Sequence, residues 1–331
     1  MRFLKRLLAV FTVLVIVYIL GPHPSNPVYN HSLPEVPASA ASLETYISQQ
    51  EAQHKIKPNN EARIVWAHDS LKQKTEYAIV YLHGFSASQE EGNPVHRNIA
   101  KQFGCNLYLS RLSQHGIDTA DALINMTADN LWESAKQAYA IGKQLGDKVI
   151  LMGTSTGGTL ALELAATYTE IAALILYSPN IAINDPNAWL INNPWGLQVA
   201  RLVKKSDFNT AKNNTAIYKQ YWNSVYRLEA AAQLQELLET SMTGNTFALI
   251  KQPVLTLYYY KDEKNQDPVV KVSAMKDMMA QLATAATQKK MTAIPEAGNH
   301  VLASPIQSKD IMRVERETAD FLQTTVHLVR R

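Results

Sequence analysis

Short apolar runs, most of them unbroken, recur along the chain from residue 62 onward. The seven runs are ARIVWAH (62–68), YAIVYLHG (77–84), NLYLSRL (106–112), KVILMG (148–153), AALILYS (172–178), PVLTLYYY (253–260) and MTAIP (291–295). Strands that are covered on both faces in a parallel sheet are apolar along their whole length instead of alternating with polar residues. The runs therefore predict the strands of a mostly parallel sheet.

Segments with apolar residues at helical spacing lie between these runs. They are 127–146, 157–168, 272–283 and 308–328. The first begins near Thr127, which is a favourable capping residue, and stops at Gly146. Alternation of strands and helices predicts an α/β fold with a doubly wound sheet.

Residues 181–250 separate two predicted strands by far more than a normal crossover connection. Tyr218, Trp222 and Tyr226 follow one another at four-residue spacing, which predicts a single aromatic face of one helix. We interpret the segment as a mostly helical cap over a pocket. Additional core packing is the alternative interpretation of the aromatic residues.

The first twenty residues have a short basic start and then an unbroken apolar run from Leu7 to Leu20. This arrangement predicts a secretory signal or an uncleaved membrane anchor over residues 1–20, with a buried core helix as the remaining alternative. We favour the anchor, because no pair of small residues suited to cleavage follows the run closely. The basic start predicts that the rest of the chain lies on the non-cytoplasmic side, periplasmic or extracellular, and is secreted if the segment is cleaved.

Residues 21–43 contain five prolines and show little periodicity, so we interpret them as an extended tether. The remaining residues, 44–331, form one predicted domain that includes the cap at about 181–250.

Charge and cysteine content exclude several classes of protein. The net charge of +3 equals the contribution of Arg2, Lys5 and Arg6, so the predicted domain is close to neutral. No basic patch with interleaved aromatic residues is present in the sequence, so we expect no nucleic-acid partner. Cys105 is the only cysteine, which excludes an intrachain disulfide. No group of His, Cys and carboxylate residues has the spacing of metal ligands, so no metal site is predicted.

The hexapeptide GTSTGG (153–158) directly follows a predicted buried strand and precedes a predicted helix. It fits the pattern G-x-S-x-G, in which the serine lies on a sharp strand-to-helix turn with its hydroxyl exposed. The positions two before and two after the serine crowd against each other, and Gly153 and Gly157 satisfy that requirement. The motif in this context predicts that Ser155 is a nucleophile.

A serine hydroxyl is a weak nucleophile at neutral pH and needs a base, for which histidine is suited. His300 follows the last predicted strand, and loops at the carboxyl ends of parallel strands meet at one edge of the sheet. We therefore predict that His300 is the base for Ser155. His83 follows an earlier strand, and we interpret it as a structural residue that holds its loop.

The third member should be a carboxylate in YKDEKNQDPVV (260–270), after the strand 253–260. Counting along the strand favours Asp262, whereas counting back from the following helix favours Asp267, and Glu263 is a minor alternative. We prefer Asp267 and keep Asp262 open.

Two backbone N–H groups are expected to stabilise the developing oxyanion. Thr156, the residue after the nucleophile, supplies one of them. Phe85, in the loop LHGFSAS (82–88), is predicted to supply the other.

These motifs, in the order LHGF, RLSQHG, GTSTGG, YKDEKNQDPVV and AGNHVLASP, resemble those of α/β-hydrolases of the carboxylesterase and monoacylglycerol-lipase-like kind. The resemblance covers about residues 60–326. It implies an eight-stranded, mostly parallel sheet, a cap inserted after the sixth strand, and serine-dependent ester hydrolysis with no metal or organic cofactor. The chain departs from the pattern in a longer acid loop, and in Ser113-Gln114 where many relatives have glycine.

The resulting hypothesis is a serine hydrolase that acts on a small-molecule or lipid ester through the triad of Ser155, His300 and Asp267 or Asp262. The same triad also suits a peptidase, a thioesterase or an acyltransferase. A non-catalytic, membrane-anchored binding protein on a hydrolase scaffold is the alternative from a different class.

Overall fold

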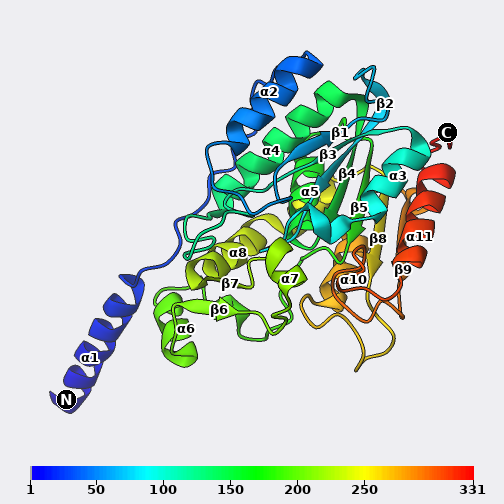
Figure 1. Ribbon diagram of the computed structural model, residues 1–331. Helices are drawn as coiled ribbons and strands as arrows, with labels where there is room; N and C mark the ends of the chain where they lie inside the picture. The colour runs from blue at the N-terminus through cyan, green and yellow to red at the C-terminus, as the bar shows by residue number, and fades with distance from the viewer. Residues whose placement is uncertain (1) are drawn as a thin grey trace.

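The computed structural model describes residues 2–331 and has a central sheet with helices on both faces (Figure 1). Within these residues the main sheet contains seven strands in the order β1-β3-β2-β4-β5-β8-β9. Their bounds are β1 (Arg63–Val65), β2 (Thr75–Leu82), β3 (Asn106–Leu109), β4 (Gly146–Thr154), β5 (Ala173–Tyr177), β8 (Val254–Tyr258) and β9 (Lys289–Ala293). All neighbouring strands are parallel except β1, which pairs antiparallel with β3. The predicted mostly parallel sheet is confirmed.

The expected number of eight strands is wrong for the described residues. Each of the seven apolar runs forms one strand, and the eighth strand was implied only by the family resemblance. The described chain before β1 forms the helices α1 (Arg2–Ile19) and α2 (Ala40–Glu51), with an extended segment between them.

Two apolar cores cover the two faces of the sheet. Alternate residues of β2 enter different cores, since Val80 and Leu82 pack into one and Ile79 and Tyr81 into the other. The first core is completed by α4 (Ala128–Leu145), α5 (Thr156–Thr167), α8 (Leu228–Ser241) and α10 (Val272–Gln281), and the second by α3 (Val95–Phe103) and α11 (Ile311–Thr324). This arrangement confirms the doubly wound α/β fold.

The segment 181–250 lies between β5 and β8 and differs from the single long helix that the aromatic spacing predicts. Its elements are α6 (Gly196–Lys204), β6 (Phe208–Thr210), α7 (Ala216–Tyr221), β7 (Val225–Arg227), α8 and α9 (Gly244–Leu249), besides a short 3₁₀ turn at Ala188–Leu190. Trp222 ends α7, and Tyr226 belongs to β7, which pairs with β6. The helix ends there because the N–H of Asn223 donates to the carbonyl of Ser86 at 2.7 Å instead of to a carbonyl of α7.

The helix α1 (Arg2–Ile19) buries none of its residues and projects from the rest of the molecule (Figure 1). Across residues 2–331, no helix combines the length and the apolar character needed to cross a membrane. The prediction of a spanning anchor therefore gains no support here.

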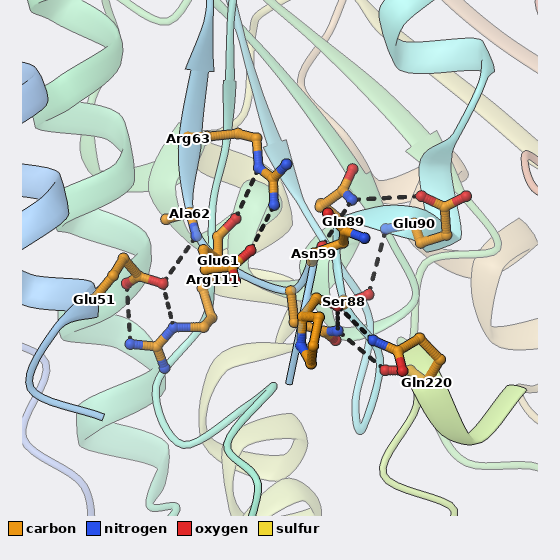
Figure 2. Close-up of polar contacts among 12 residues, drawn as sticks. Glu51, Asn59, Glu61, Ala62, Arg63, Ser88, Gln89, Glu90, Arg111 and Gln220 are labelled. Carbon is orange, nitrogen blue, oxygen red and sulfur yellow. Dashed lines mark hydrogen bonds and ion pairs between the residues drawn. The ribbon is translucent and has the colours of Figure 1, made fainter. Parts of the chain in front are cut away.

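Residues 22–38 carry no helix or strand, but they are held against the domain. The indole N–H of Trp132 in α4 donates to the carbonyl of Asn30 at 2.8 Å, and Lys136 Nζ donates to the carbonyl of Ser32 at 2.9 Å. The following helix α2 is fixed by the ion pair between Glu51 and Arg111, whose Oε2 and Nε atoms are 2.7 Å apart (Figure 2).

Candidate active site

Ser155 lies at the junction between β4 and α5, at the carboxyl end of a central strand. Its backbone has φ of 53° and ψ of −118°, a conformation that L-residues rarely adopt and that marks a strained turn. A side chain at Gly157 would overlap the carbonyl oxygen of Leu82, and one at Gly153 would approach the carbonyl of Gly157. The two glycines therefore allow the turn to form as the motif requires.

His300 and Asp267 come from the loops after β9 and β8, and their side chains meet. His300 Nδ1 and Asp267 Oδ2 are 2.7 Å apart, and both residues are buried. Asp267 Oδ1 accepts two more hydrogen bonds, from the N–H groups of Val269 at 2.9 Å and Val270 at 3.0 Å. The carboxylate is thus fixed on both oxygens, which orients the imidazole of His300.

The charges of this pair stabilise each other. Burial alone would raise the pKa of Asp267, but the charge of His300 and the hydrogen bonds to the carboxylate hold it below its usual value. Burial alone would lower the pKa of His300, but the charge and hydrogen bond of Asp267, with a smaller effect of Glu91, raise it. Asp267 therefore favours the protonated imidazolium of His300.

Asp262 does not reach His300. Its carboxylate is exposed and accepts hydrogen bonds from the N–H groups of Lys264 and Asn265, both at 2.9 Å, and from the Asn265 amide. Asp262 thus stabilises its own turn, and of the two carboxylates left open by the sequence only Asp267 contacts the histidine. Glu263, the minor alternative, instead accepts from the Tyr260 hydroxyl.

Ser155 and His300 line one cavity, but their functional atoms are not hydrogen-bonded to each other in this structure. Within residues 2–331, the buried His300 Nε2 has no hydrogen-bond partner. Hydrogen bonds between a nucleophile and its base are often long in unliganded sites and tighten when substrate binds. Nε2 is therefore the nitrogen of His300 that remains available to act as the predicted base.

The loop that carries Phe85 lies beside the serine turn, because Leu82 at the end of β2 pairs with Gly153 of β4. His83 holds this loop, since its Nε2 accepts from the N–H of Leu112 at 3.0 Å and its Nδ1 contacts the carbonyl of Gly84 at 2.9 Å. Burial lowers the pKa of His83 well below its usual value. The residue is therefore neutral, which agrees with the structural interpretation.

The N–H of Phe85 donates to no backbone acceptor of residues 2–331 outside helices and strands, and Thr156 is the first residue of α5, where a backbone N–H has no partner within the helix. Both residues flank Ser155 in space or in sequence, and unoccupied N–H groups at this place suit an oxyanion. Their role in catalysis stays a prediction.

A cavity of about 870 Å³ is formed between the sheet edge and the segment 181–250. Its apolar lining includes Ile183, Leu190, Ile191, Val199, Leu228 and Leu234. Tyr218, Trp222 and Tyr226 also line it, although no single helix carries them. Tyr218 stacks on Trp222 with ring centroids 4.9 Å apart, and Phe85 packs edge-on against Tyr226 at the same separation.

Residues 127–302, which are 176 of the 331 residues, match the protein family described as serine aminopeptidase, S33. This stretch includes the serine turn, the segment 181–250, Asp267 and His300. The chain belongs to this α/β-hydrolase family. No curated protein matches the chain.

Solved structures share this hydrolase fold at low sequence identity. A metagenome-derived lipolytic enzyme from work on LipS and LipT is 17% identical, covers 81% of this chain and 99% of its own, and has a TM-score of 0.63. The monoacylglycerol lipase of Paleococcus ferrophilus is 15% identical over 79% of this chain and 97% of its own, with a TM-score of 0.58. A soluble variant of monoglyceride lipase from Saccharomyces cerevisiae, in complex with a substrate analogue, is 14% identical over 93% of this chain and 99% of its own, with a TM-score of 0.56. These similarities show the fold.

One departure from the family pattern keeps a glycine-like backbone. Gln114, in RLSQHG, has φ of 66°, and Gly116 has φ of 69°. The backbone of Gln114 thus adopts the left-handed region, which glycine enters more readily than other residues.

Glu91 is a site residue that the sequence analysis does not identify. It lies in a 3₁₀ turn (Gln89–Gly92), is 2% exposed, and lines the cavity together with Ser155 and His300. Its Oε2 accepts a hydrogen bond from the N–H of Gly84 at 2.6 Å. The only signal in the sequence is an acidic pair, Glu90-Glu91, shortly after LHGFS, and such pairs are usually solvated.

Proposed function

We propose that the protein is a serine hydrolase that cleaves carboxylic esters through an acyl-enzyme. The observation that carries this proposal is the buried contact between His300 Nδ1 and Asp267 Oδ2, with His300 and Ser155 lining the same cavity and His300 Nε2 without a hydrogen-bond partner within residues 2–331. Membership in an α/β-hydrolase family supports it.

In the proposed reaction, Ser155 Oγ attacks the carbonyl carbon of the ester while His300 Nε2 takes its proton. Asp267 stabilises the imidazolium that forms, and the N–H groups of Phe85 and Thr156 bind the oxyanion. His300 then donates the proton to the oxygen of the departing alcohol. Water, deprotonated by His300, attacks the acyl-enzyme, and the acid leaves while Ser155 regains its proton.

The cavity favours a substrate with an apolar acyl group. Its volume lies within the usual range for small-ligand sites, and aliphatic and aromatic side chains make up most of its lining. Structures of similar fold include lipolytic enzymes and monoglyceride lipases, which is consistent with an acyl ester as substrate.

The proposal is tested with p-nitrophenyl esters from acetate to palmitate, using the wild type and Ser155→Ala. We expect turnover by the wild type and a loss of several orders of magnitude in Ser155→Ala. Because the family description names a peptidase, aminoacyl p-nitroanilides are assayed in parallel. Amide cleavage without ester cleavage, or no turnover of either class by the folded wild type, would contradict the ester-hydrolase proposal.

We also propose that the N-terminal segment directs the domain to the non-cytoplasmic side of a membrane. The basic start and the apolar run from Leu7 to Leu20 support this export. Fusing residues 1–43 to a reporter that is active only after export gives the test. We expect the reporter to be active. The mass of the N-terminal peptide then distinguishes a cleaved signal from a retained anchor. A reporter that stays inactive in the cytoplasm would contradict export.

A further inference from the structure

The buried carboxylate of Glu91 has no place in the reaction proposed above. Within residues 2–331 no Lys or Arg forms an ion pair with it, although burying an unpaired carboxylate is unfavourable. The N–H of Gly84 donates to it, and the charge of His300 and the side chain of Trp222 also favour its ionised form. Its charge adds to the effect of burial in raising the pKa of Tyr81 and Tyr218. Three chain segments therefore converge on one carboxylate beside the candidate nucleophile.

Gly84 is packed between Glu91 and Ser155. A side-chain carbon at Gly84 would lie 2.9 Å from Glu91 Oε2 and 3.0 Å from the Cβ of Ser155. Its N–H donates to Glu91, and the next residue is Phe85, whose N–H is one of the two predicted oxyanion donors. A displacement of the Gly84 backbone would therefore displace the Phe85 N–H relative to Ser155.

The turn that carries Glu91 is itself held in place from outside the cavity. Ser88 caps it, and the side-chain amide of Gln89 donates to the carbonyl of Asn59 at 3.3 Å (Figure 2). On its buried side, His96 Nε2 lies 2.8 Å from the carbonyl of Gln89. Glu91 is thus presented to Gly84 from a fixed support.

We propose that Glu91 is a positioning residue, which holds the Gly84–Phe85 backbone so that the Phe85 N–H points at the oxyanion. The proposal rests on the proposed serine hydrolase function. A hydrogen bond to an ionised acceptor is about twice as strong as one between neutral groups, so the ionised carboxylate holds the loop most firmly.

The cost of keeping this charge supports a functional role. Burial raises the pKa of Glu91 to about 7, against the opposing effects of the Gly84 N–H, His300 and Trp222. A glutamine would accept the same hydrogen bond without an ionised group in the core. A carboxylate kept at such a place is typical of functional sites.

The pH dependence follows from the two groups that titrate in the site. Protonation of His300 removes the base and abolishes turnover. Protonation of Glu91 leaves an oxygen that still accepts from Gly84, but without the charge, so it lowers the rate only in part. We therefore expect kcat/KM of the wild type to fall on the acid side through two overlapping ionisations, of which that of Glu91 has a pKa of about 7.

The test uses the full chain and compares Glu91→Ala, Glu91→Gln and the control Glu90→Ala. Glu90 lies in the same turn, bonds only Gln89 and Asn93 through its side chain within residues 2–331, and is outside the cavity. We expect kcat for a short p-nitrophenyl ester at pH 8 to fall roughly 50-fold in Glu91→Ala with little change in KM, because removing an oxyanion donor outright costs about 10²–10³-fold. Glu91→Gln should lose only about 5-fold and show the His300 step alone, and Glu90→Ala should match the wild type.

The outcomes separate this inference from the function on which it rests. An active wild type with kcat unchanged in Glu91→Ala would overturn the role of Glu91 and leave the proposed function intact. A folded wild type without turnover would remove the proposed function, and the role of Glu91 with it. If Glu91→Ala does not fold, Glu91→Gln supplies the test. A kcat/KM profile of Glu91→Gln that falls on the acid side through the same two ionisations as the wild type would overturn the inference.

Discussion

At the scale of single residues, the orientation of one imidazole depends on which carboxylate it meets. Asp267 accepts three hydrogen bonds, from His300 and from the backbone of Val269 and Val270, so neither of its oxygens is free to rotate away. With Nδ1 of His300 engaged there, Nε2 is left for Ser155. Asp262 lies only five residues earlier but serves its own turn.

This difference gives a prediction for the two acidic side chains. Asp267→Asn should lower kcat by about 10³–10⁴-fold at pH 8, because the amide does not stabilise the imidazolium and favours the wrong tautomer. Asp262→Asn, the matched control from the same loop, should stay within about threefold of the wild type, as neutral substitutions away from a triad do. Steady-state kinetics with one ester measures both, and the reverse order of the two effects would assign the role to Asp262.

Glu91 predicts a dependence of stability on pH. Its pKa is about 7 in the folded protein, against 4.5 for the unperturbed group, so below about pH 4.5 both states are protonated and the burial of Glu91 brings no ionisation penalty. As the pH rises from 4.5 to 7, Glu91 ionises in the unfolded chain before it ionises in the folded protein. The free energy of unfolding therefore falls by up to about 3 kcal/mol over this range, and the whole loss is present above pH 7.

Glu91→Gln removes this loss. Relative to the wild type, its free energy of unfolding should therefore rise by roughly 2–3 kcal/mol between pH 4.5 and pH 8. Urea unfolding at the two pH values measures the difference, and Glu90→Gln serves as the control. An equal difference between wild type and Glu91→Gln at both pH values would contradict the buried, titrating carboxylate.

At the scale of elements, the first two helices differ in how much they contribute to the buried core. α1 buries no residue, whereas α2 buries Leu43 and Ile47 and holds the Arg111 guanidinium through Glu51. The extended segment between them lies along α4, because side chains of α4 donate hydrogen bonds to its backbone carbonyls. Residues before the predicted domain start at residue 44 thus contact the domain, and we expect the fold to depend on residues 22–51 as well.

Two truncations test this dependence. A chain that begins at residue 22 should keep its Tm within about 2 °C of the full chain, because little apolar surface is lost. A chain that begins at residue 52 loses the burial of Leu43 and Ile47, about 1.5–3 kcal/mol each, and leaves Arg111 unpaired. Its Tm in a thermal melt should fall by at least about 10 °C, and equal melting of the two chains would contradict the structural role of residues 22–51.

Some elements depend on local sequence and others on distant contacts. The helix after Thr127 could be predicted because its start depends on local chemistry, a capping box between Thr127 and Asn130. The break after Tyr221 could not, because helical spacing continues through Trp222 and Tyr226. The backbone of Asn223 turns away to bind Ser86, which is 137 residues earlier in the chain.

At the scale of the whole molecule, the sheet and the segment 181–250 together form the cavity. Ala200 in α6 lines it, about 45 residues after Ser155 in sequence, whereas Leu202 on the same helix is 78% exposed and does not line it. The acyl group of a long ester would have to extend toward this region.

Narrowing the cavity should therefore change the preference for chain length. Ala200→Trp is expected to lower kcat/KM for palmitate esters at least about tenfold relative to acetate esters, because the added ring fills space in a packed site. Leu202→Trp adds the same ring outside the cavity and should leave the ratio unchanged. If both variants keep the wild-type ratio, the acyl group does not lie against α6.

The strands, the serine turn and the position of His300 could be predicted because each depends on a short local pattern and on the rule that strand ends meet at one edge. The choice between Asp267 and Asp262 could not, because both lie in one loop and only its folded path brings one of them to His300. Glu91 was missed for a related reason, since a glutamate pair in a loop is typical of a solvated surface and its burial is produced by Gly84 and Trp222 from elsewhere in the chain.

The most direct test of the central claim is covalent labelling of the wild type with a fluorophosphonate probe, followed by mass spectrometry of the labelled peptide. The account predicts one label, on Ser155, that disappears in Ser155→Ala and is greatly slowed in His300→Ala, because the probe reacts only with an activated serine. A folded wild type that takes no label, or that takes it on a different residue, would contradict the assignment of Ser155 as the nucleophile.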